Sequence, residues 1–308
     1  MKKLLFLLVL SLPGCADFSI KKPMIHTILR TPLETSIDIS NSPNQTQPPP
    51  ITIWIHGTRL LPKALFKKLF YSKPGLHLYS ELEPHFHQFE IAQALIDSNP
   101  SKFCAETFYL FGWSGKLSFE ERKKAAERLY SELKLLREQY KYQYGIEPVI
   151  YLITHSHGGN IALQLACVKD PSDTEFSIQQ LILLACPVQE KTSCYIDSDL
   201  FKTIYSLYSL LDVTQLADPQ GLQTKEIKDV PLFSKRHFPP HKKLEQVAIK
   251  LNNRSPMHIE FVQQKFLIHL SKIIEEIDKW KINGCSKNDY SLDKCIAINT
   301  KHKNTTTA

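Results

Sequence analysis

Several signatures of common protein classes are missing from this chain of 308 residues. The apolar run at residues 4–12 is shorter than the roughly 20 residues that a membrane-spanning helix needs. None of the seven cysteines has the spacing of a zinc site. The formal charge of +7 is mild, and no compact basic and aromatic motif favours binding to nucleic acid. No internal repeat is present. With 43% apolar and 22% charged residues, the composition is that of a globular protein.

The N-terminus has the features of an export signal. Lys2 and Lys3 precede the apolar run, and Leu12-Pro13-Gly14-Cys15 follows it. This string resembles the bacterial lipobox, in which cleavage precedes a cysteine that then receives lipid. The resemblance implies a lipoprotein signal at residues 1–14, a lipid on Cys15, and an exported protein anchored to a membrane of the cell envelope. Pro13 is unusual there, so an ordinary secretory signal cleaved nearby stays open.

The rest of the chain divides into three stretches. Residues 15–50 are polar and end rich in proline, which predicts a tether. We expect a single folded domain at 51–284 and a polar tail at 285–308. In an exported protein the cysteines can form disulfides, and Cys285 and Cys295 are the favoured pair. Cys167 and Cys186 lie in apolar stretches and are expected to be buried thiols.

Apolar runs alternate with helical patterns along the expected domain. Runs typical of strands lie at 51–55, 107–111, 149–153, 181–186 and 203–210. A capping box at Ser118–Glu121 opens a predicted helix that Gly145 ends, and a last helix is expected at 259–281. Strands that are apolar throughout, separated by helices, predict an α/β fold with a mostly parallel central sheet covered by helices on both faces.

The hexapeptide Thr154-His155-Ser156-His157-Gly158-Gly159 directly follows one of these strands and precedes a predicted helix. A serine on such a turn projects its hydroxyl away from the sheet at a helix N-terminus, where backbone N–H groups can stabilise an oxyanion. The string resembles the nucleophile elbow of the α/β-hydrolase family. Thr154 departs from the family pattern, which has glycine two residues before the serine. The resemblance implies the α/β-hydrolase fold and Ser156 as a catalytic nucleophile.

The family places an acid and then a histidine after the nucleophile. Asp212 follows a predicted strand and is the preferred acid, with Asp218 as the alternative. His258 lies on the loop before the last predicted helix, where members of the family carry their catalytic base. The other histidines after Asp212 are less well placed: His237, His241, His269 and His302.

The segment Ile55-His56-Gly57-Thr58 follows the first predicted strand and resembles the oxyanion segment of the family. The resemblance implies that the backbone N–H groups of Thr58 and His157 bind the oxyanion. Gly112-Trp113-Ser114-Gly115 also follows a strand, but Lys116 occupies the place of the second glycine. We therefore interpret this second turn as structural or pocket-lining.

These patterns together predict a serine ester hydrolase of the lipase or esterase type, with an acyl-ester or lipid substrate and no cofactor or metal. A Ser-His-Asp triad would act through an acyl-enzyme. A basic amphipathic segment at residues 61–73 is either a lid or an ordinary scaffold helix. Two alternatives stay open. One is an inactive hydrolase fold that serves as a surface binding lipoprotein, and the other is a serine hydrolase acting on thioesters or peptides.

Overall fold

The computed structural model describes residues 47–58, 73–212, 237–282 and 294–299. Several sequence predictions fall outside these ranges: the signal and Cys15, nearly all of the tether, all but the last residue of the segment 61–73, Asp218, Cys285 and His302. No helix in the described part of the chain is both long enough and apolar enough to cross a bilayer. The fold below is that of the unit that starts at Gln47.

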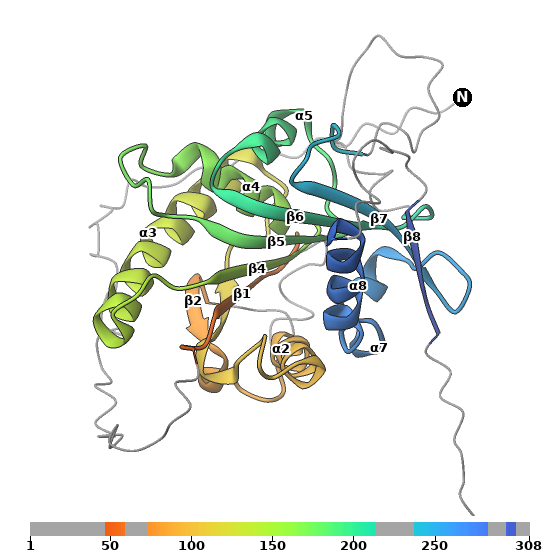
Figure 1. Ribbon diagram of the computed structural model, residues 1–308, viewed down its shortest axis with the longest axis horizontal. Coiled ribbons are helices and arrows are strands. Elements are labelled where there is room, and N and C mark those ends of the chain that lie inside the picture. Colours follow the sequence, from red (N-terminus) through yellow and green to blue (C-terminus); the bar gives the residue numbers. More distant parts are fainter. Residues whose placement is uncertain (1–46, 59–72, 213–236, 283–293, 300–308) are drawn as a thin grey trace, which may run out of the picture. The chain divides into compact units, whose positions relative to one another are not determined.

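The central element of this unit is a sheet with eight strands in the described residues (Figure 1). Its order is β2-β3-β1-β4-β5-β6-β7-β8, and every neighbouring pair is parallel except β2 with β3. The strands are β1 (Ile51–Ile55), β2 (Gly75–Leu78), β3 (Phe108–Gly112), β4 (Ile150–His155), β5 (Ile178–Leu184), β6 (Phe201–Tyr208), β7 (Leu244–Leu251) and β8 (Cys295–Ile298).

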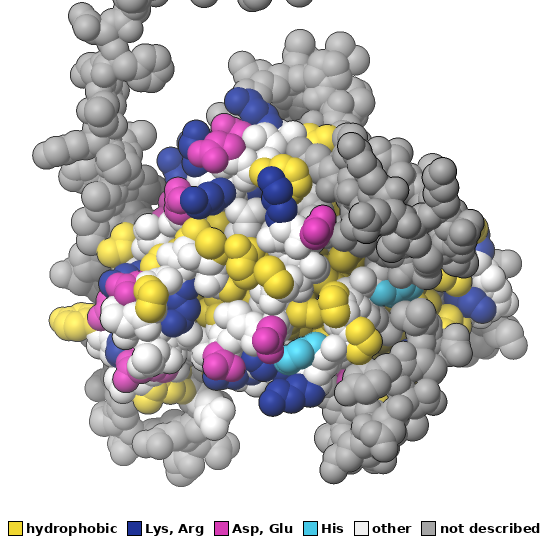
Figure 2. Space-filling model, turned by 90° about the horizontal axis from the view of Figure 1, so that it is seen from above, with side chains coloured by type: hydrophobic (Ala, Val, Ile, Leu, Met, Phe, Trp, Pro, Cys, Tyr) yellow, Lys and Arg dark blue, Asp and Glu magenta, His cyan; other side chains and the backbone are white. Residues whose placement is uncertain are grey.

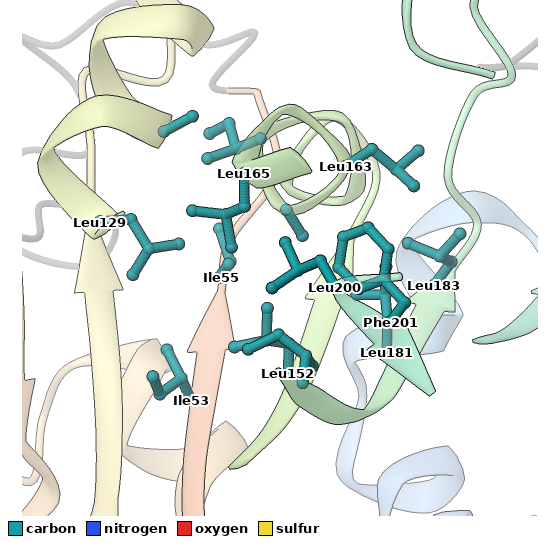
Figure 3. Packing of buried hydrophobic residues seen from close by; sticks show 14 of the residues in the cluster. Ile53, Ile55, Leu129, Leu152, Leu163, Leu165, Leu181, Leu183, Leu200 and Phe201 are labelled. Carbon is teal, nitrogen blue, oxygen red and sulfur yellow. The ribbon is translucent and has the colours of Figure 1, made fainter. Parts of the chain in front are cut away.

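Helices cover the two faces of the sheet (Figure 1). In the described residues the α-helices are α2 (His87–Ser98), α3 (Phe119–Tyr144), α4 (Gly158–Val168), α5 (Glu190–Ser193), α7 (Gln264–Leu267) and α8 (Leu270–Ile282). One apolar cluster joins the sheet to α3 and α4, with Leu129, Leu163 and Leu165 packed on strand residues (Figure 3). A second cluster joins the opposite face to α2, α7 and α8. The predicted α/β fold, with a mostly parallel sheet between two helical layers, is confirmed.

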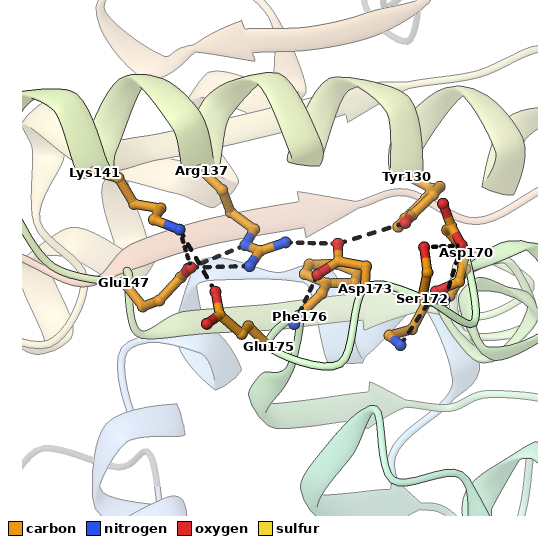
Figure 4. A network of polar contacts seen from close by, with 10 residues as sticks. Tyr130, Arg137, Lys141, Glu147, Asp170, Ser172, Asp173, Glu175 and Phe176 are labelled. Atoms are coloured by element: carbon orange, nitrogen blue, oxygen red, sulfur yellow. Dashed lines mark hydrogen bonds and ion pairs between the residues drawn. The ribbon is translucent and has the colours of Figure 1, made fainter.

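The caps of α3 lie where the sequence places them. The Ser118 hydroxyl accepts a hydrogen bond from the backbone N–H of Glu121 at 3.4 Å. Gly145 ends the helix with φ +71°, a backbone conformation that costs glycine little. Near this end the buried guanidinium of Arg137 pairs with Glu147 and Asp173, and Lys141 also pairs with Glu147 (Figure 4).

The C-terminal part differs from the sequence prediction. In place of one helix at 259–281 there are a 3₁₀ segment, η6 (His258–Val262), then α7 and α8. Consecutive Phe261 and Val262 are both buried and Ile259 is exposed, which does not fit a single helical stripe. Strand β8 pairs with β7 although it lies in the predicted polar tail. The expectation for Cys167 is wrong, since it is exposed at the end of α4, whereas Cys186 is buried as predicted. Cys295 has no disulfide partner in the described residues.

The surface carries charges of both signs. On the face shown in Figure 2, Lys and Arg side chains stand among Asp and Glu side chains around a central group of hydrophobic side chains. Among the described residues, the exposed large hydrophobic side chains fall into two groups. Leu135, Tyr142, Ile146 and Val149 lie on α3 and the loop after it, and Leu210, Leu211, Met257 and Ile259 lie on the loops after β6 and β7.

Candidate active site

The parallel strands bring the predicted site residues to one edge of the sheet. The segment 56–58 follows β1, Ser156 follows β4, Asp212 follows β6, and His258 lies on the loop after β7. β1 pairs with β3 on one side and with β4 on the other. The strands up to β3 therefore extend the sheet to one side of β1, and the strands from β4 onward extend it to the other side. Open α/β sheets form their sites at such a point, beyond the carboxyl ends of the strands.

Ser156 lies on a sharp turn between β4 and α4. Its φ is +53°, a left-handed conformation that is unfavourable for a residue with a side chain. The backbone N–H of Ser156 donates to the carbonyl of Leu184 at 2.9 Å, which ties the turn to the end of β5. The residue is 7% exposed. This geometry is that of the strand-turn-helix elbow expected from the sequence.

The two glycines after the serine allow close approach of α4 to the sheet. A Cβ on Gly158 would lie 2.5 Å from the carbonyl oxygen of Ile55 and 2.7 Å from that of His56. A Cβ on Gly159 would lie 2.5 Å from the Cys186 sulfur. All three distances are too short for real contacts, so any larger residue at either position would displace the helix. Thr154, which stands where the family pattern has glycine, is fully buried, and its hydroxyl donates to the carbonyl of Ile182 at 3.1 Å.

The structure brings Asp212 and His258 together. His258 Nδ1 lies 2.7 Å from Asp212 Oδ2, and the carboxylate is 1% exposed. Because a carboxylate can only accept, Nδ1 carries the proton and donates it, which leaves Nε2 able to accept another. The His258 side chain is 15% exposed. An imidazole oriented in this way by a buried carboxylate is suited to act as a general base.

His155 connects the serine turn to the histidine loop, a role that the sequence prediction missed. Its Nε2–H donates to the backbone carbonyl of His258 at 3.2 Å, and the two rings lie 4.7 Å apart. Burial, reinforced by the nearby His258, lowers the pKa of His155 well below its usual range. His155 is therefore neutral, and Ser156 follows it directly in the chain.

The segment expected to stabilise an oxyanion lies against the serine. A Cβ on Gly57 would be 2.7 Å from Ser156 Cβ, so the segment 56–58 packs closely against the serine. Thr58 is the next residue in this segment. His157 is the N-cap of α4, which places its backbone N–H at the helix N-terminus. The hydroxyl oxygen of Thr58 is buried with no hydrogen-bond partner in the described residues.

Trp113 holds this segment in place. Its indole N–H donates to the carbonyl of His56 at 2.8 Å, and its ring stacks on the His56 ring with centroids 5.6 Å apart. His56 Nδ1 lies 2.7 Å from the carbonyl oxygen of Gly57, so Nδ1 carries the proton and Nε2 accepts from the Trp113 backbone N–H at 3.4 Å. Trp113, which belongs to the turn around Ser114, thus supports the segment 56–58 through its side chain and its backbone N–H.

Within the described residues, no group of three or more His, Cys, Asp and Glu side chains is placed to hold a metal ion. The titratable side chains at the site instead pair with one another, with backbone carbonyls or with aromatic rings.

No protein-family model matches the chain, and no curated protein matches it in sequence. Solved structures do match. An α/β serine hydrolase from Xanthomonas campestris without a lid is 13% identical, with 77% of this chain and 86% of that chain covered and a TM-score of 0.38. An esterase from Pyrococcus furiosus is 12% identical, with 75% and 82% covered and a TM-score of 0.38. An α/β-hydrolase superfamily protein from Enterococcus faecalis is 13% identical, with 77% and 92% covered and a TM-score of 0.36.

Proposed function

We propose that this protein is a serine ester hydrolase. The observation that carries the proposal is the buried Asp212–His258 pair at the same edge of the sheet as Ser156, whose backbone is held in a left-handed conformation at the start of α4. The strained turn, the oriented imidazole and the helix N-terminus are the parts that acyl transfer requires.

In the proposed reaction the Ser156 hydroxyl attacks the acyl carbonyl while His258 Nε2 accepts its proton. Asp212 stabilises the imidazolium that forms, through the hydrogen bond at Nδ1. The backbone N–H groups of Thr58 and His157 stabilise the oxyanion. His258 then returns the proton to the leaving alcohol, which leaves an acyl-enzyme on Ser156. Water next attacks the acyl carbonyl while His258 accepts its proton, and His258 passes this proton to the Ser156 oxygen as the acid departs.

The apolar residues beside the site favour an apolar acyl group. Leu210 and Leu211 directly precede Asp212, and Met257 and Ile259 flank His258. All four are large, hydrophobic and between 44% and 60% exposed. A rim of this kind around a polar centre suits an acyl chain or a lipid surface, because binding removes apolar area from water.

We also propose that the enzyme acts at the cell envelope, anchored by a lipid on Cys15. Cys15 lies outside the described residues, so this proposal depends on the lipobox-like string alone. Mass spectrometry of the membrane fraction would detect a diacylated Cys15, and a Cys15→Ala variant in the soluble fraction would serve as the control.

The proposed reaction is tested by Ser156→Ala. We expect the variant to lose hydrolysis of p-nitrophenyl esters and labelling by a fluorophosphonate probe, with peptide mapping of the wild type placing the probe on Ser156. Unfolding in urea checks that the variant is folded. Turnover that is unchanged in the folded variant contradicts the proposal. A folded wild type that neither labels nor turns over, with or without detergent, favours the inactive surface lipoprotein instead. Thioester and peptide substrates assayed in parallel decide between the two catalytic alternatives.

A further inference from the structure

The carboxylate of Glu260, two residues after His258, is buried but paired. Its side chain is 3% exposed and accepts two hydrogen bonds, one from each terminal nitrogen of Arg254, both at 2.6 Å. These bonds outweigh the effect of burial and lower the pKa of Glu260 to about 2. Glu260 is therefore ionised over the whole range of pH in which an ester hydrolase with a histidine base works.

Two more donors reach the same carboxylate. The backbone N–H of Met257 lies 2.8 Å from Oε2, and Lys265 Nζ lies 2.7 Å from Oε1. Arg254 and Met257 precede His258 in the chain, and Lys265 follows it. One carboxylate thus closes residues 254–265 into a loop that contains His258.

The closed loop is also fastened to both neighbouring site elements. The Ser209 hydroxyl, on the loop that carries Asp212, donates to the carbonyl of Pro256 at 2.5 Å. His155, on the strand that leads to Ser156, donates to the carbonyl of His258. These two bonds fix where the loop lies, and the Glu260 bonds fix its internal shape.

The segment needs such bonds because regular structure holds it only weakly. Asn252 and Asn253 both have positive φ values, 52° and 62°, and the segment continues through an extended stretch before the 3₁₀ turn η6. Irregular backbone of this kind has many accessible conformations, and fixing each residue in one of them costs conformational entropy. Charge-assisted hydrogen bonds from Arg and Lys are strong enough to select one conformation.

We propose that Glu260 is a positioning residue that holds His258 in register with Asp212 and Ser156. The proposal rests on the proposed function, since it assigns the pairing of Glu260 to catalysis as well as to stability. Loss of the carboxylate would let His258 move relative to the serine. A displacement of about 1 Å at a reacting group can cost about a hundredfold in rate.

The chain offers a matched control in Glu147. This carboxylate also pairs with both an arginine and a lysine: Arg137 at 3.0–3.1 Å and Lys141 at 2.8 Å (Figure 4). It precedes the first residue of β4, whereas Ser156 follows the last, so it lies at the opposite edge of the sheet. Glu147→Gln therefore removes a carboxylate with the same kinds of partner away from the site, although Glu147 is more exposed, at 36%.

The experiment compares Glu260→Gln with Glu147→Gln in the full chain. We expect Glu260→Gln to lower kcat on a p-nitrophenyl ester, and the rate of fluorophosphonate labelling, by about 10- to 100-fold with little change in KM. Both rates are corrected for the folded fraction. Glu147→Gln should keep both rates. Lower stability of Glu260→Gln with an unchanged kcat of the folded fraction would overturn the proposal, because it shows a purely structural role.

A readout that needs no activity separates this proposal from the proposed function. The Nδ1 proton of His258, hydrogen-bonded to Asp212, should give a slowly exchanging NMR resonance in the wild type and in Glu147→Gln. We expect it to broaden or disappear in Glu260→Gln. Its persistence there would refute the positioning role even if the wild type hydrolyses no ester. Should Glu260→Gln not fold, Arg254→Lys keeps the charge but loses the two-pronged contact, and the same measurements apply.

Discussion

Gly57→Ala tests the contact between the oxyanion segment and the serine. The new methyl carbon would lie 2.7 Å from Ser156 Cβ, 3.1 Å from the His155 carbonyl oxygen and 3.2 Å from His155 Nδ1. Carbon atoms in favourable contact are about 3.5–4.0 Å apart, so the serine or the segment must move by about 1 Å. Two of these atoms, Ser156 Cβ and the His155 carbonyl oxygen, are attached directly to the backbone and cannot rotate away.

The expected magnitude follows from this displacement. Overpacking of this kind costs about 1–3 kcal/mol of the free energy of unfolding. A shift of about 1 Å between the nucleophile and the oxyanion donors should lower kcat by about a hundredfold. We therefore expect a folded protein, somewhat less stable, with a loss of activity far larger than its loss of folded molecules.

The assay measures ester hydrolysis and fluorophosphonate labelling, both normalised to the folded fraction from urea unfolding. Gly145→Ala is the control. Gly145 has φ +71° with no atom within 4 Å of the new Cβ, so alanine there adds backbone strain of about 1–2 kcal/mol without touching the site. Rates for folded Gly57→Ala within about threefold of the wild type would refute the reasoning, because the expected loss of about a hundredfold is far larger.

Two further predictions concern neighbours of the serine. Thr58→Val keeps the backbone N–H but removes a buried hydroxyl with no partner in the described residues. We expect the free energy of unfolding to rise by about 1 kcal/mol, as measured by urea unfolding. Ester kinetics should show kcat within about threefold of the wild type, because the proposed oxyanion donor is the backbone N–H, which valine keeps. His155 has a pKa lowered by burial, so the unfolded chain binds an extra proton below about pH 6.5. Stability should therefore fall with falling pH, and in His155→Gln the slope between about pH 5 and 6.5 should be smaller by up to about 1.4 kcal/mol per unit. Equal slopes in the two proteins would contradict this assignment.

Much of the site could be predicted because its residues occupy fixed positions relative to strands. Continuous apolar runs identify β1, β4, β5 and β6. Ser156 directly follows β4, and a short segment after β6 leads to Asp212. The two glycines of the elbow have the close contacts that the pattern implies. These features depend on neighbours in the sequence, which is why the sequence reveals them.

The missed features depend on contacts between distant residues. Strand β7 reads Leu-Glu-Gln-Val-Ala-Ile-Lys-Leu, and its polar residues hide a strand whose Glu245 is buried and paired with Lys294. That lysine adjoins β8, which a polar composition gave no reason to expect. Glu260 falls inside the helix predicted at 259–281, and nothing in the local pattern shows that Arg254 folds back onto its carboxylate.

The parallel order of the sheet also governs when the site can exist during folding. Thr58 and His258 stand 200 positions apart, and parallel strands require a long crossover before they can pair. The histidine loop follows β7, and the pairing of β7 with β6 places it at the same end of the sheet as the serine turn. Non-local pairings of this kind form slowly, so a partly folded chain contains the elbow without the groups that would activate it. The candidate site is consequently a property of the paired sheet and not of any one segment of the chain.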